Sequence, residues 1–534
     1  MVSPVGRRES PDSARTTPTR PSTIEATAAD DDEISRLLSP SFSRASSADL
    51  SDRLLGERDA QDGFASPLYP YTIVFVFGLV LVTGFGSSLL NTPEVRLLEM
   101  ALCRDYYRTN DPSVIGPPPL SYVDEENCKV DSIQVELAYI MATRSLLSAI
   151  PGIFLTFPYG QLANKIGRRP VVLLGLLGEM LEYFWVILVC YFHEVFPTRL
   201  VLISPVFVVI GGGSKVISAC IYTIITDVTP EHIRTTIFYL AGAGILLSAL
   251  IAMPFGSFLL SIDLWLPYKF STPVLLSAFP LIFAMPETMP KSSIEDEMSP
   301  ERIDVQEGGS STVHRLRAMV ISLAQRLKQS LVALNPSAVR KEITLILVIL
   351  FLSMFCSMTG RIFVQYTSKL LGWSISTAGY ILGIRAFAAL CVLFCLAGIT
   401  QLLEKTNTLR PLLLDVWVVR LSFIALSVGT AFIAISRESG LLIAGSVLSS
   451  VGNGLAPAMQ GLLAHFADSS LTAQVFASAA LVELLAEFVG GFAFAGLFDI
   501  GIRGGQFPGI GLPFYVSAVL TLFAGALSFL LPTA

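Results

Sequence analysis

Charged side chains inside long apolar runs are the residues of this chain that could do chemistry. Five cations fall in such runs: Arg144, Lys215, Arg361, Arg385 and Arg420. Each costs about 2.5–3.5 kcal/mol to insert into a membrane, so each needs an acidic partner or a wet cavity. The chemistry available to them is ion pairing, proton relay, or attraction of an anionic or carbonyl-bearing ligand.

One ion pair is predicted from depth along neighbouring antiparallel segments. At 1.5 Å per residue, Arg144 lies about 14 Å and Glu182 about 15 Å from the same surface. Glu179 is one turn from Glu182 on the same helix face. We expect a structural pair here, with a transport role for these residues as the alternative.

A second acid–cation pair is predicted near the end of the chain. Glu483 and Glu487 are four residues apart, so they share one helix face. Glu487 lies near the estimated depth of Arg385, about 15 Å from the surface. Burial favours the protonated carboxyl and a cation favours the carboxylate, so such a pair can bind and release a proton. We expect Glu487 to be a proton-coupling residue, with Glu483 and Glu182 as further candidates; a static ion pair is the alternative.

Three more residues are candidates for a central cavity. Lys215 lies mid-segment, where it can attract an anionic or carbonyl-bearing substrate, or instead snorkel or pair with an acid. Asn453 and Gln460 could offer polar contacts to a substrate, although helix–helix hydrogen bonding is the alternative.

The elements that carry these residues are about twelve apolar segments of membrane-spanning length. The chain has 534 residues, of which 52% are hydrophobic and only 15% charged. A soluble domain has about 25% charged residues, so we expect an all-α membrane protein. The predicted spans are 71–91, 135–158, 171–192, 200–226, 236–261, 268–285, 343–365, 376–400, 411–434, 440–465, 474–497 and 512–532.

Two regions lie outside these spans. Residues 1–69 are rich in Ser, Thr, Pro and Asp and predict a disordered tail. Residues 287–342 form a polar loop whose stretch 313–334 predicts an amphipathic helix on the membrane surface, or else a plain solvated linker. With both termini in the cytosol, 22 of the 36 Lys and Arg residues are cytosolic, as the positive-inside rule favours.

An internal repeat divides the spans into halves of six, 70–286 and 343–534. At a constant offset of 241 residues, the stretch 138–144 matches 379–385, and Arg169-Pro170 matches Arg410-Pro411. Gly211, Gly213 and Asp227 match Gly452, Gly454 and Asp468 at the same offset. Such duplication is typical of secondary transporters with a cavity between two halves, and it argues against an ion channel.

A loop motif follows the second span. It reads Gly160-Gln161-Leu162-Ala163-Asn164-Lys165-Ile166-Gly167-Arg168-Arg169-Pro170. This resembles the signature loop of the major facilitator superfamily in both pattern and position, and Pro286-Glu287-Thr288 after span six also resembles that superfamily. The resemblance covers residues 70–534 and is strongest to fungal efflux members. Cysteines in the first outer loop, Arg144 and the stretch 226–229 bear a weaker similarity to the proton-coupled folate transporter branch.

The resemblance implies roles for the loop residues. We expect Gly160 to allow close helix approach, Gly167 to permit a tight turn, and Lys165, Arg168 and Arg169 to hold the loop in the cytosol. In the superfamily, an acid at the fifth motif position latches the outward-open state against a helix N-terminus. Here that position is Asn164, which brings no charge, so we expect a weaker latch.

Cysteines and sorting signals complete the predictions. Cys103 and Cys128 both lie in the first outer loop, and we expect them to form a disulfide, with two free thiols as the alternative. Glu33-Ile34-Ser35-Arg36-Leu37-Leu38 fits an acidic dileucine sorting signal, although chance explains it equally well. We expect the plasma membrane, with the vacuolar membrane as the alternative. No cofactor, metal or nucleic-acid site is predicted.

These observations lead to one interpretation with two alternatives. We expect a monomeric secondary transporter in the lipid bilayer that exports a hydrophobic metabolite or drug by alternating access, driven by protons. Proton-coupled uptake of an organic anion is the first alternative, suggested by Arg144, Lys215 and Arg385. A membrane sensor that does not transport is the second. No set of residues favours an enzyme.

Overall fold

The computed structural model describes residues 69–117, 121–229, 231–288, 341–406, 411–466, 472–505 and 509–532. Residues 64–534 form one compact unit. The predicted tail before Tyr69 and the predicted amphipathic helix 313–334 lie outside the described residues. Within the described ranges every regular element is a helix.

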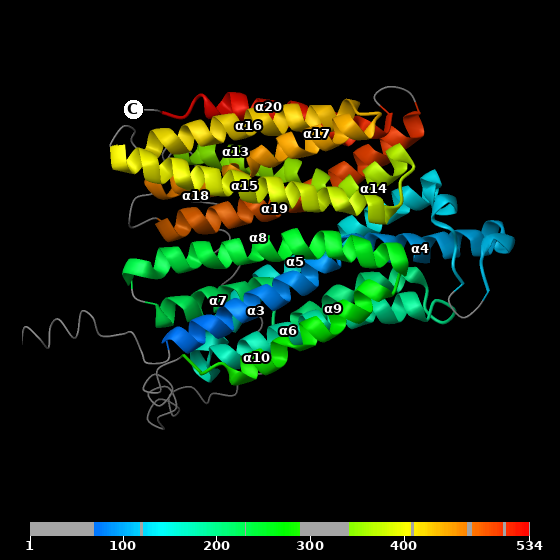
Figure 1. The fold of residues 1–534 in the computed structure, drawn as a ribbon, viewed down its shortest axis with the longest axis horizontal. Coiled ribbons are helices and arrows are strands. Elements are labelled where there is room, and N and C mark those ends of the chain that lie inside the picture. The colour runs from blue at the N-terminus through cyan, green and yellow to red at the C-terminus, as the bar shows by residue number, and fades with distance from the viewer. Residues whose placement is uncertain are drawn as a thin grey trace, which may run out of the picture. The chain divides into compact units, whose positions relative to one another are not determined.

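Among the described residues, the first half contains eight α-helices and three 3-10 helices, arranged as in Figure 1. They are α3 (Tyr69–Leu89), α4 (Asn91–Asn110), η1 (Pro112–Val114), η2 (Glu125–Lys129), α5 (Asp131–Ile166), α6 (Arg168–Tyr191), η3 (Thr198–Val209), α7 (Gly213–Val228), α8 (Glu231–Ile262), α9 (Leu266–Leu276) and α10 (Ala278–Ala284).

The second half follows the same plan. It contains α13 (Lys341–Ser357), α14 (Thr359–Leu371), α15 (Ile375–Thr406), α16 (Pro411–Ile435), α17 (Ser439–Ser450), η5 (Val451–Gly454), α18 (Leu455–Phe466), α19 (Thr472–Gly504), η6 (Gly509–Gly511) and α20 (Leu512–Ser528).

The described residues contain twelve segments long and apolar enough to cross a membrane, which confirms the predicted all-α membrane fold. Some spans are made of two consecutive helices: α3 with α4, α9 with α10, α13 with α14, and η3 with α7. One prediction was wrong in detail: the chain does not enter a loop after residue 91 but continues as α4. Span four, predicted at 200–226, lies within the spanning segment Thr198–Val228, and its first part is the 3-10 helix η3, in which Pro205 cannot donate an α-helical hydrogen bond.

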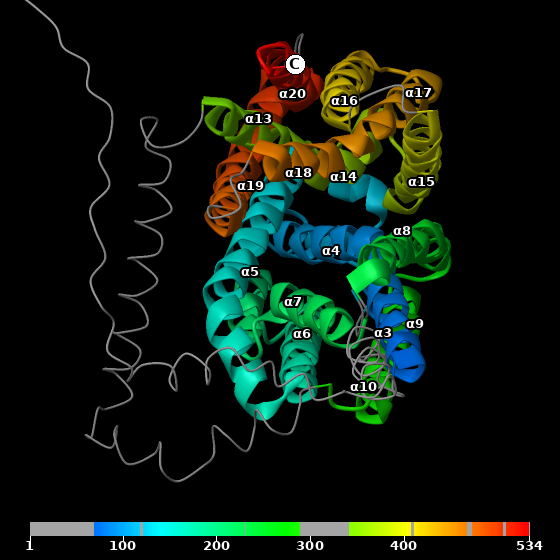
Figure 2. The same ribbon diagram turned by 90° about the vertical axis from the view of Figure 1, so that its left-hand side faces the viewer.

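The two halves meet along two helix pairs. In each half the second and fifth spans face the other half: α5 packs on α19, and α8 packs on α15. Figure 2 shows these pairs between the two bundles. We call the end of the bundle that carries α4 and η2 the disulfide end, and the opposite end, where α3 begins and α20 ends, the termini end (Figure 1).

Buried apolar residues form three clusters with different distributions. At the disulfide end one cluster includes residues of both halves, such as Leu137 and Phe363. Toward the termini end the clusters separate: one contains only first-half residues such as Ile224, and the other only second-half residues such as Leu462. The halves therefore share a core at one end and have separate cores at the other.

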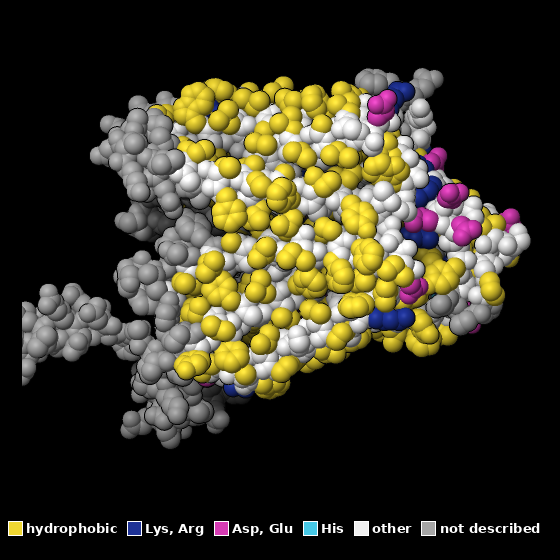
Figure 3. Space-filling view, viewed as in Figure 1, with side chains coloured by type: hydrophobic (Ala, Val, Ile, Leu, Met, Phe, Trp, Pro, Cys, Tyr) yellow, Lys and Arg dark blue, Asp and Glu magenta, His cyan; other side chains and the backbone are white. Residues whose placement is uncertain are grey.

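The outer surface of the helices is apolar. Hydrophobic side chains cover the face seen in Figure 3, whereas Lys, Arg, Asp and Glu gather at the disulfide end. Exposed Phe, Leu, Ile and Val residues occur on almost every span. Such a belt suits contact with lipid acyl chains, which need no hydrogen bonds from the protein.

Candidate functional site

Two cavities of similar size lie inside the bundle, one in each half. The second-half cavity has a volume of about 530 Å³ and the first-half cavity about 540 Å³. Volumes in this range suit small organic ligands. The residues that line each cavity all belong to one half, so the two sites can be compared side by side.

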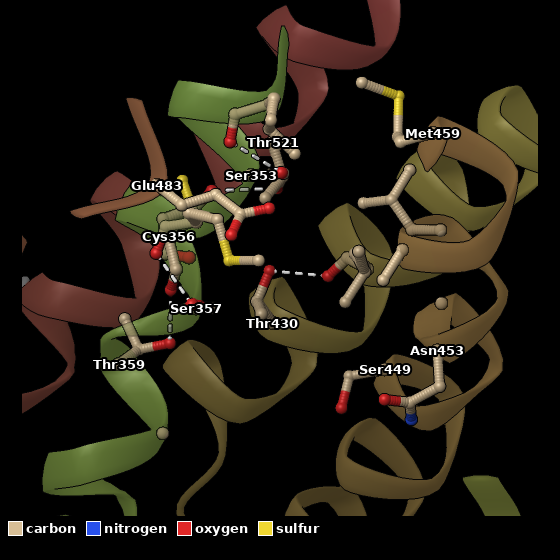
Figure 4. Close-up of a pocket in the computed structure, with 18 of the residues that line it drawn as sticks. Ser353, Cys356, Ser357, Thr359, Thr430, Ser449, Asn453, Met459, Glu483 and Thr521 are labelled. Carbon is tan, nitrogen blue, oxygen red and sulfur yellow. Dashed lines mark hydrogen bonds between the residues drawn. The ribbon is translucent and has the colours of Figure 1, made fainter. Parts of the chain in front are cut away.

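The second-half cavity is lined mainly by apolar and hydroxyl side chains (Figure 4). The hydroxyls of Ser353, Thr430 and Thr521 donate to carbonyls of their own helices, at 2.8 Å, 2.7 Å and 2.8 Å. Their oxygens keep lone pairs that can accept a hydrogen bond from a ligand. Met459 adds an adaptable apolar surface. This lining suits a largely apolar ligand that forms few hydrogen bonds.

The predicted cavity residues Asn453 and Gln460 both line this second-half cavity. Asn453 lies near Ser449 in Figure 4, and its amide donates to the carbonyl of Ser450 at 2.8 Å. The Asn453 amide oxygen is then available to a ligand. Gln460 lies on α18 and is exposed. Glu483, a predicted proton-coupling residue, contributes the one acid among the residues lining this cavity.

Arg385 lines the second-half cavity, but the prediction that it pairs with Glu487 was wrong. Its guanidinium lies 4.9 Å from the ring centroid of Phe363, a cation–π contact. No acid among the described residues comes within ion-pair distance of it. Depth along the helix was predicted well enough, but depth says nothing of which way a side chain points around the axis.

Glu487 instead pairs with Arg361, at 3.9 Å. Arg361 also hydrogen-bonds Ser145 of the first half. These residues line a small crevice where α5 meets α19, close to where Gly491 faces Ala142. The Glu487 carboxyl therefore lies at the contact between the halves rather than in a cavity.

Arg144 lies in the first-half cavity between two acids. Its guanidinium pairs with Glu182 at 3.6 Å, the pair expected from depth, and it also bonds Glu94. Ser148 donates to Glu182 at 2.8 Å. Sequence reasoning missed Glu94 because the apolar run ends before it; the continuing helical pattern through α4 would have revealed it. A cation between two carboxylates attracts an anionic substrate less than a free one does.

Lys215 lies on the exposed face of α7 and lines neither of these two cavities. Its side-chain stem would contact a Cβ added at Gly152 of α5. No described acid lies within ion-pair distance, although Lys215 interacts electrostatically with Glu483 of the other half. The pair thus spans the two halves without touching.

At the disulfide end, Cys103 of α4 and Cys128 of η2 are joined by a disulfide whose Cα atoms are 5.3 Å apart. It fixes residues 121–131, which we call the strap, onto α4. Within the strap, Tyr122 donates a hydrogen bond to Asp263 at 3.1 Å. Burial and the Asp263 carboxylate raise the pKa of Tyr122 to about 12, so this donor stays protonated at any physiological pH.

A buried ion network holds the strap in place. Glu99, which has no exposed surface, accepts from Arg96 at 2.9 Å and from Lys129 at 2.8 Å. Lys129 also pairs with Glu125 at 2.9 Å. Two cations and two acids therefore balance one another, as buried charges require.

The strap reaches the second half directly. The Glu125 carboxylate accepts from the backbone N–H of Ile375 at 2.6 Å, at the start of α15. Lys369 of α14 pairs with Asp131 at 2.7 Å and donates to the carbonyl of Lys129 at 2.6 Å. An acid at a helix N-terminus and a cation at the last turn of a helix are both favoured by the helix dipole. The strap is thus a tie between the halves.

The signature loop lies at the termini end. Gly167 has φ +100°, which favours glycine, and a Cβ there would lie 2.5 Å from Glu287. The Glu287 carboxylate accepts from the backbone N–H groups of Arg168 and Arg169, at 2.9 Å and 3.2 Å, and so caps α6. Arg168 also pairs with Asp227 at 3.3 Å. The signature loop 160–170 and the stretch 286–288, both of which resemble the superfamily, therefore bind each other within the first half.

One expectation for this loop needs revision, and the expected weaker latch at Asn164 stays a prediction. Gly160 was expected to allow close helix approach, but nothing lies within 4 Å of a Cβ built there. Asn164, the position of the latch, is exposed and hydrogen-bonds Arg168 of its own loop. Lys165 is likewise exposed. In this conformation the contacts described for the loop stay within the first half.

Comparisons with known proteins agree on one family. Residues 129–491 match the profile of the Major Facilitator Superfamily. The chain is 28% identical over 451 residues to the MFS efflux pump atnC of Emericella nidulans, covering 84% of this chain and 85% of that one. It is 26% identical over 475 residues to the efflux pump ustT of Aspergillus flavus, covering 87% and 88%.

Solved structures share the fold at low sequence identity. A D-xylose–proton symporter aligns with TM-score 0.57 at 15% identity, over 86% of this chain and 97% of that one. The human organic anion transporter MFSD10 aligns with TM-score 0.52 at 18% identity, over 87% and 100%.

Proposed function

This chain belongs to the Major Facilitator Superfamily and is a membrane transporter rather than an enzyme, and from that premise we propose that it exports an amphipathic organic molecule in exchange for protons. The transporter works by alternating access, in which the halves rock about a cavity near mid-membrane. Both termini lie in the cytosol, and the plasma membrane is its site, with the vacuolar membrane as the alternative.

The divided core is the observation that carries this proposal. The halves share a core at the disulfide end and have separate cores at the termini end, as a transporter open toward the termini end requires. The positive-inside rule predicts from the sequence that the signature loop is cytosolic, and that loop lies at the termini end. The cavities would then receive substrate from the cytosol, which agrees with the efflux names of the relatives.

The lining of the second-half cavity supports an amphipathic substrate. It offers hydroxyl and amide oxygens around apolar surface, with Arg385 as the one cation among its lining residues. A ligand that forms few hydrogen bonds loses little hydration on entering such a site. Apolar contact then supplies most of the affinity, at about 25 cal/mol per Å² of apolar surface removed from water.

Glu487 is the proposed coupling residue because of its position between the halves. A proton added to its carboxyl removes the charge that holds Arg361, which also contacts Ser145 across the interface. The halves can then rearrange, and loss of the proton restores the pair. Glu483 is the second candidate, because Lys215 of the other half lies close enough to interact with it electrostatically. Glu182 is the third.

Uptake of an organic anion is the second candidate function. The observation that favours it is Arg385, a cavity cation without an acid partner among the described residues. Arg144 argues the other way, because Glu94 and Glu182 already neutralise it. Export therefore remains the better-supported function.

The test is flux of a fluorescent amphipathic dye in proteoliposomes with an imposed proton gradient. We expect the gradient to accelerate flux, and Glu487→Gln to abolish that acceleration while leaving dye binding intact. Glu438→Gln, on an exposed loop, is the matched control. Gradient-independent exchange in the unmodified protein would contradict coupling, and no flux of dyes or organic anions would favour the sensor alternative.

A further inference from the structure

The first-half cavity carries more negative than positive groups. Its lining residues include three carboxyls, Glu94, Glu179 and Glu182, and one cation, Arg144. Lys215 lies on the adjacent helix α7 but is not among them; α7 contributes Ser214 and Ser218 instead. The second-half cavity, by contrast, balances one acid with one cation.

Glu179 is the carboxyl left over when the pairs are assigned. Arg144 is taken by Glu94 and by Glu182, and Glu182 is further bonded by Ser148. No described residue pairs with or donates to Glu179. A carboxylate at this depth needs a cation or a proton to offset its lost hydration.

Two tyrosine rings also line this cavity. The rings of Tyr183 and Tyr268 stack with centroids 6.1 Å apart, and both residues line the cavity. Tyr268 is 5% exposed, and its hydroxyl has no hydrogen-bond partner in the described structure. A buried hydroxyl without a partner loses the hydrogen bonds it makes in water, and a ligand that donates to its oxygen restores one of them. Aromatic faces next to a carboxylate are a recurring setting for organic cations.

We propose that this cavity binds the protonated basic nitrogen of the substrate, between the Glu179 carboxylate and the Tyr268 hydroxyl oxygen. This rests on the proposed export function and narrows the substrate class to amphipathic amines. Arg144 keeps Glu94 and Glu182 occupied, so the site offers one free carboxylate for one ammonium. The N–H groups donate to Glu179 and Tyr268, and the apolar part of the ligand lies against the tyrosine rings.

The test uses three matched probes on the purified full-length protein: monodansylcadaverine and its alcohol and carboxylate analogues. Binding is followed by dansyl fluorescence. We expect the amine to bind about tenfold more tightly than the alcohol, as a charge-assisted hydrogen bond would give, and the carboxylate to bind most weakly. Glu179→Gln should bring the amine down to the affinity of the alcohol, without changing the alcohol.

Further variants separate this role from a structural one. Glu179→Asp keeps the charge and should retain a preference for the amine, and Tyr268→Phe should weaken it only for the amine. Glu194→Gln, an exposed acid outside the cavity, should change nothing. An unchanged amine affinity in Glu179→Gln, or equal loss for all three probes, would overturn the inference.

The outcome is distinguishable from a failure of the proposed function. If the dye of the flux assay is exported but the amine probe binds no more tightly than the alcohol, export stands and the amine site is wrong. If no probe binds and no dye moves, export itself is wrong, and the amine site falls with it.

Discussion

The disulfide end and the termini end of this bundle are built from the same helices but are held together in opposite ways. At the disulfide end, apolar residues of both halves form one core, and the strap adds ion pairs and hydrogen bonds across the interface. At the termini end, each half has its own core, and the signature loop binds Glu287 of its own half. The contacts that join halves thus concentrate at one end.

This comparison indicates which contacts determine the free-energy difference between the state open at the termini end and the state open at the disulfide end. To open the disulfide end, the protein must separate a shared core and break the tie between the strap and α14–α15. To close the termini end, it must gain new contacts there, and Asn164 supplies no charge for the family's latch. Both features favour the state open at the termini end, which agrees with the proposed export of a substrate that enters from that end.

The largest expected effect comes from preventing the disulfide end from opening. In a background with Cys391 and Cys395 replaced by serine, Asp131→Cys and Lys369→Cys can be joined by a bismaleimide, because the native side chains lie 2.7 Å apart. We expect the cross-link to abolish dye flux in proteoliposomes. Each single variant treated with the same reagent should keep its flux. Normal flux in fully cross-linked protein would show that this end need not separate.

Removing the disulfide should have the next largest effect. Cys103→Ser opens a covalent loop of sequence separation 25, and loops of this size contribute about 3 kcal/mol to the free energy of unfolding. The strap then depends on its ion network alone. We expect the thermal unfolding midpoint of the purified protein to fall by several degrees. Cys391→Ser, at an exposed free cysteine, is the control, and an unchanged midpoint in Cys103→Ser would mean that the strap is held without its disulfide.

Removing a contact between the strap and the second half, with the disulfide intact, should shift the equilibrium from the state open at the termini end toward the state open at the disulfide end. Lys369→Met removes the ion pair with Asp131 and the hydrogen bond to the strap, together worth about 1 kcal/mol, or roughly fivefold in the ratio of states. A reporter Ala456→Cys, exposed in the second-half cavity, would then react more slowly with a maleimide added from the termini side. Lys269→Met removes an exposed charge at the same end and should leave the rate unchanged. Faster labelling in Lys369→Met would reverse the assignment of the strap.

The sequence predicted much of the fold but less of the site, and the reason is geometric. Twelve apolar runs predicted the membrane-spanning segments directly. Depth along a helix follows from counting residues, and similar depths correctly predicted the pair of Arg144 and Glu182. The direction of a side chain around its helix depends on how helices pack, so Arg385 was paired with the wrong acid. Glu94 was missed because the end of an apolar run shows where contact with lipid ends, whereas the helical segment continues beyond it as α4. The strap's contacts join residues about 240 positions apart, and no local pattern carries them.

The smallest expected effect comes from restoring a charge at the termini end. Asn164→Asp returns the acid of the family's latch, which a helix dipole favours by about 0.3–1 kcal/mol. The new carboxylate should also bond Arg168, already paired with Asp227, and this competition keeps the gain at the low end of that range. Because the acid favours the state closed at the termini end, labelling of Ala456→Cys should slow.

Asn164→Ala is the matched control for that variant, since it changes the same side chain without adding charge and should leave the labelling rate unaltered. Combining Asn164→Asp with Lys369→Met then tests whether the two ends act independently. If each end contributes its own free energy to a single equilibrium, the two decreases in labelling should multiply. If Asn164→Asp slows labelling only when Lys369 is intact, the strap and the loop are coupled through the helices between them. If it has no effect in either background, the termini end closes without a latch, and the shared core and the strap alone determine which way the transporter faces.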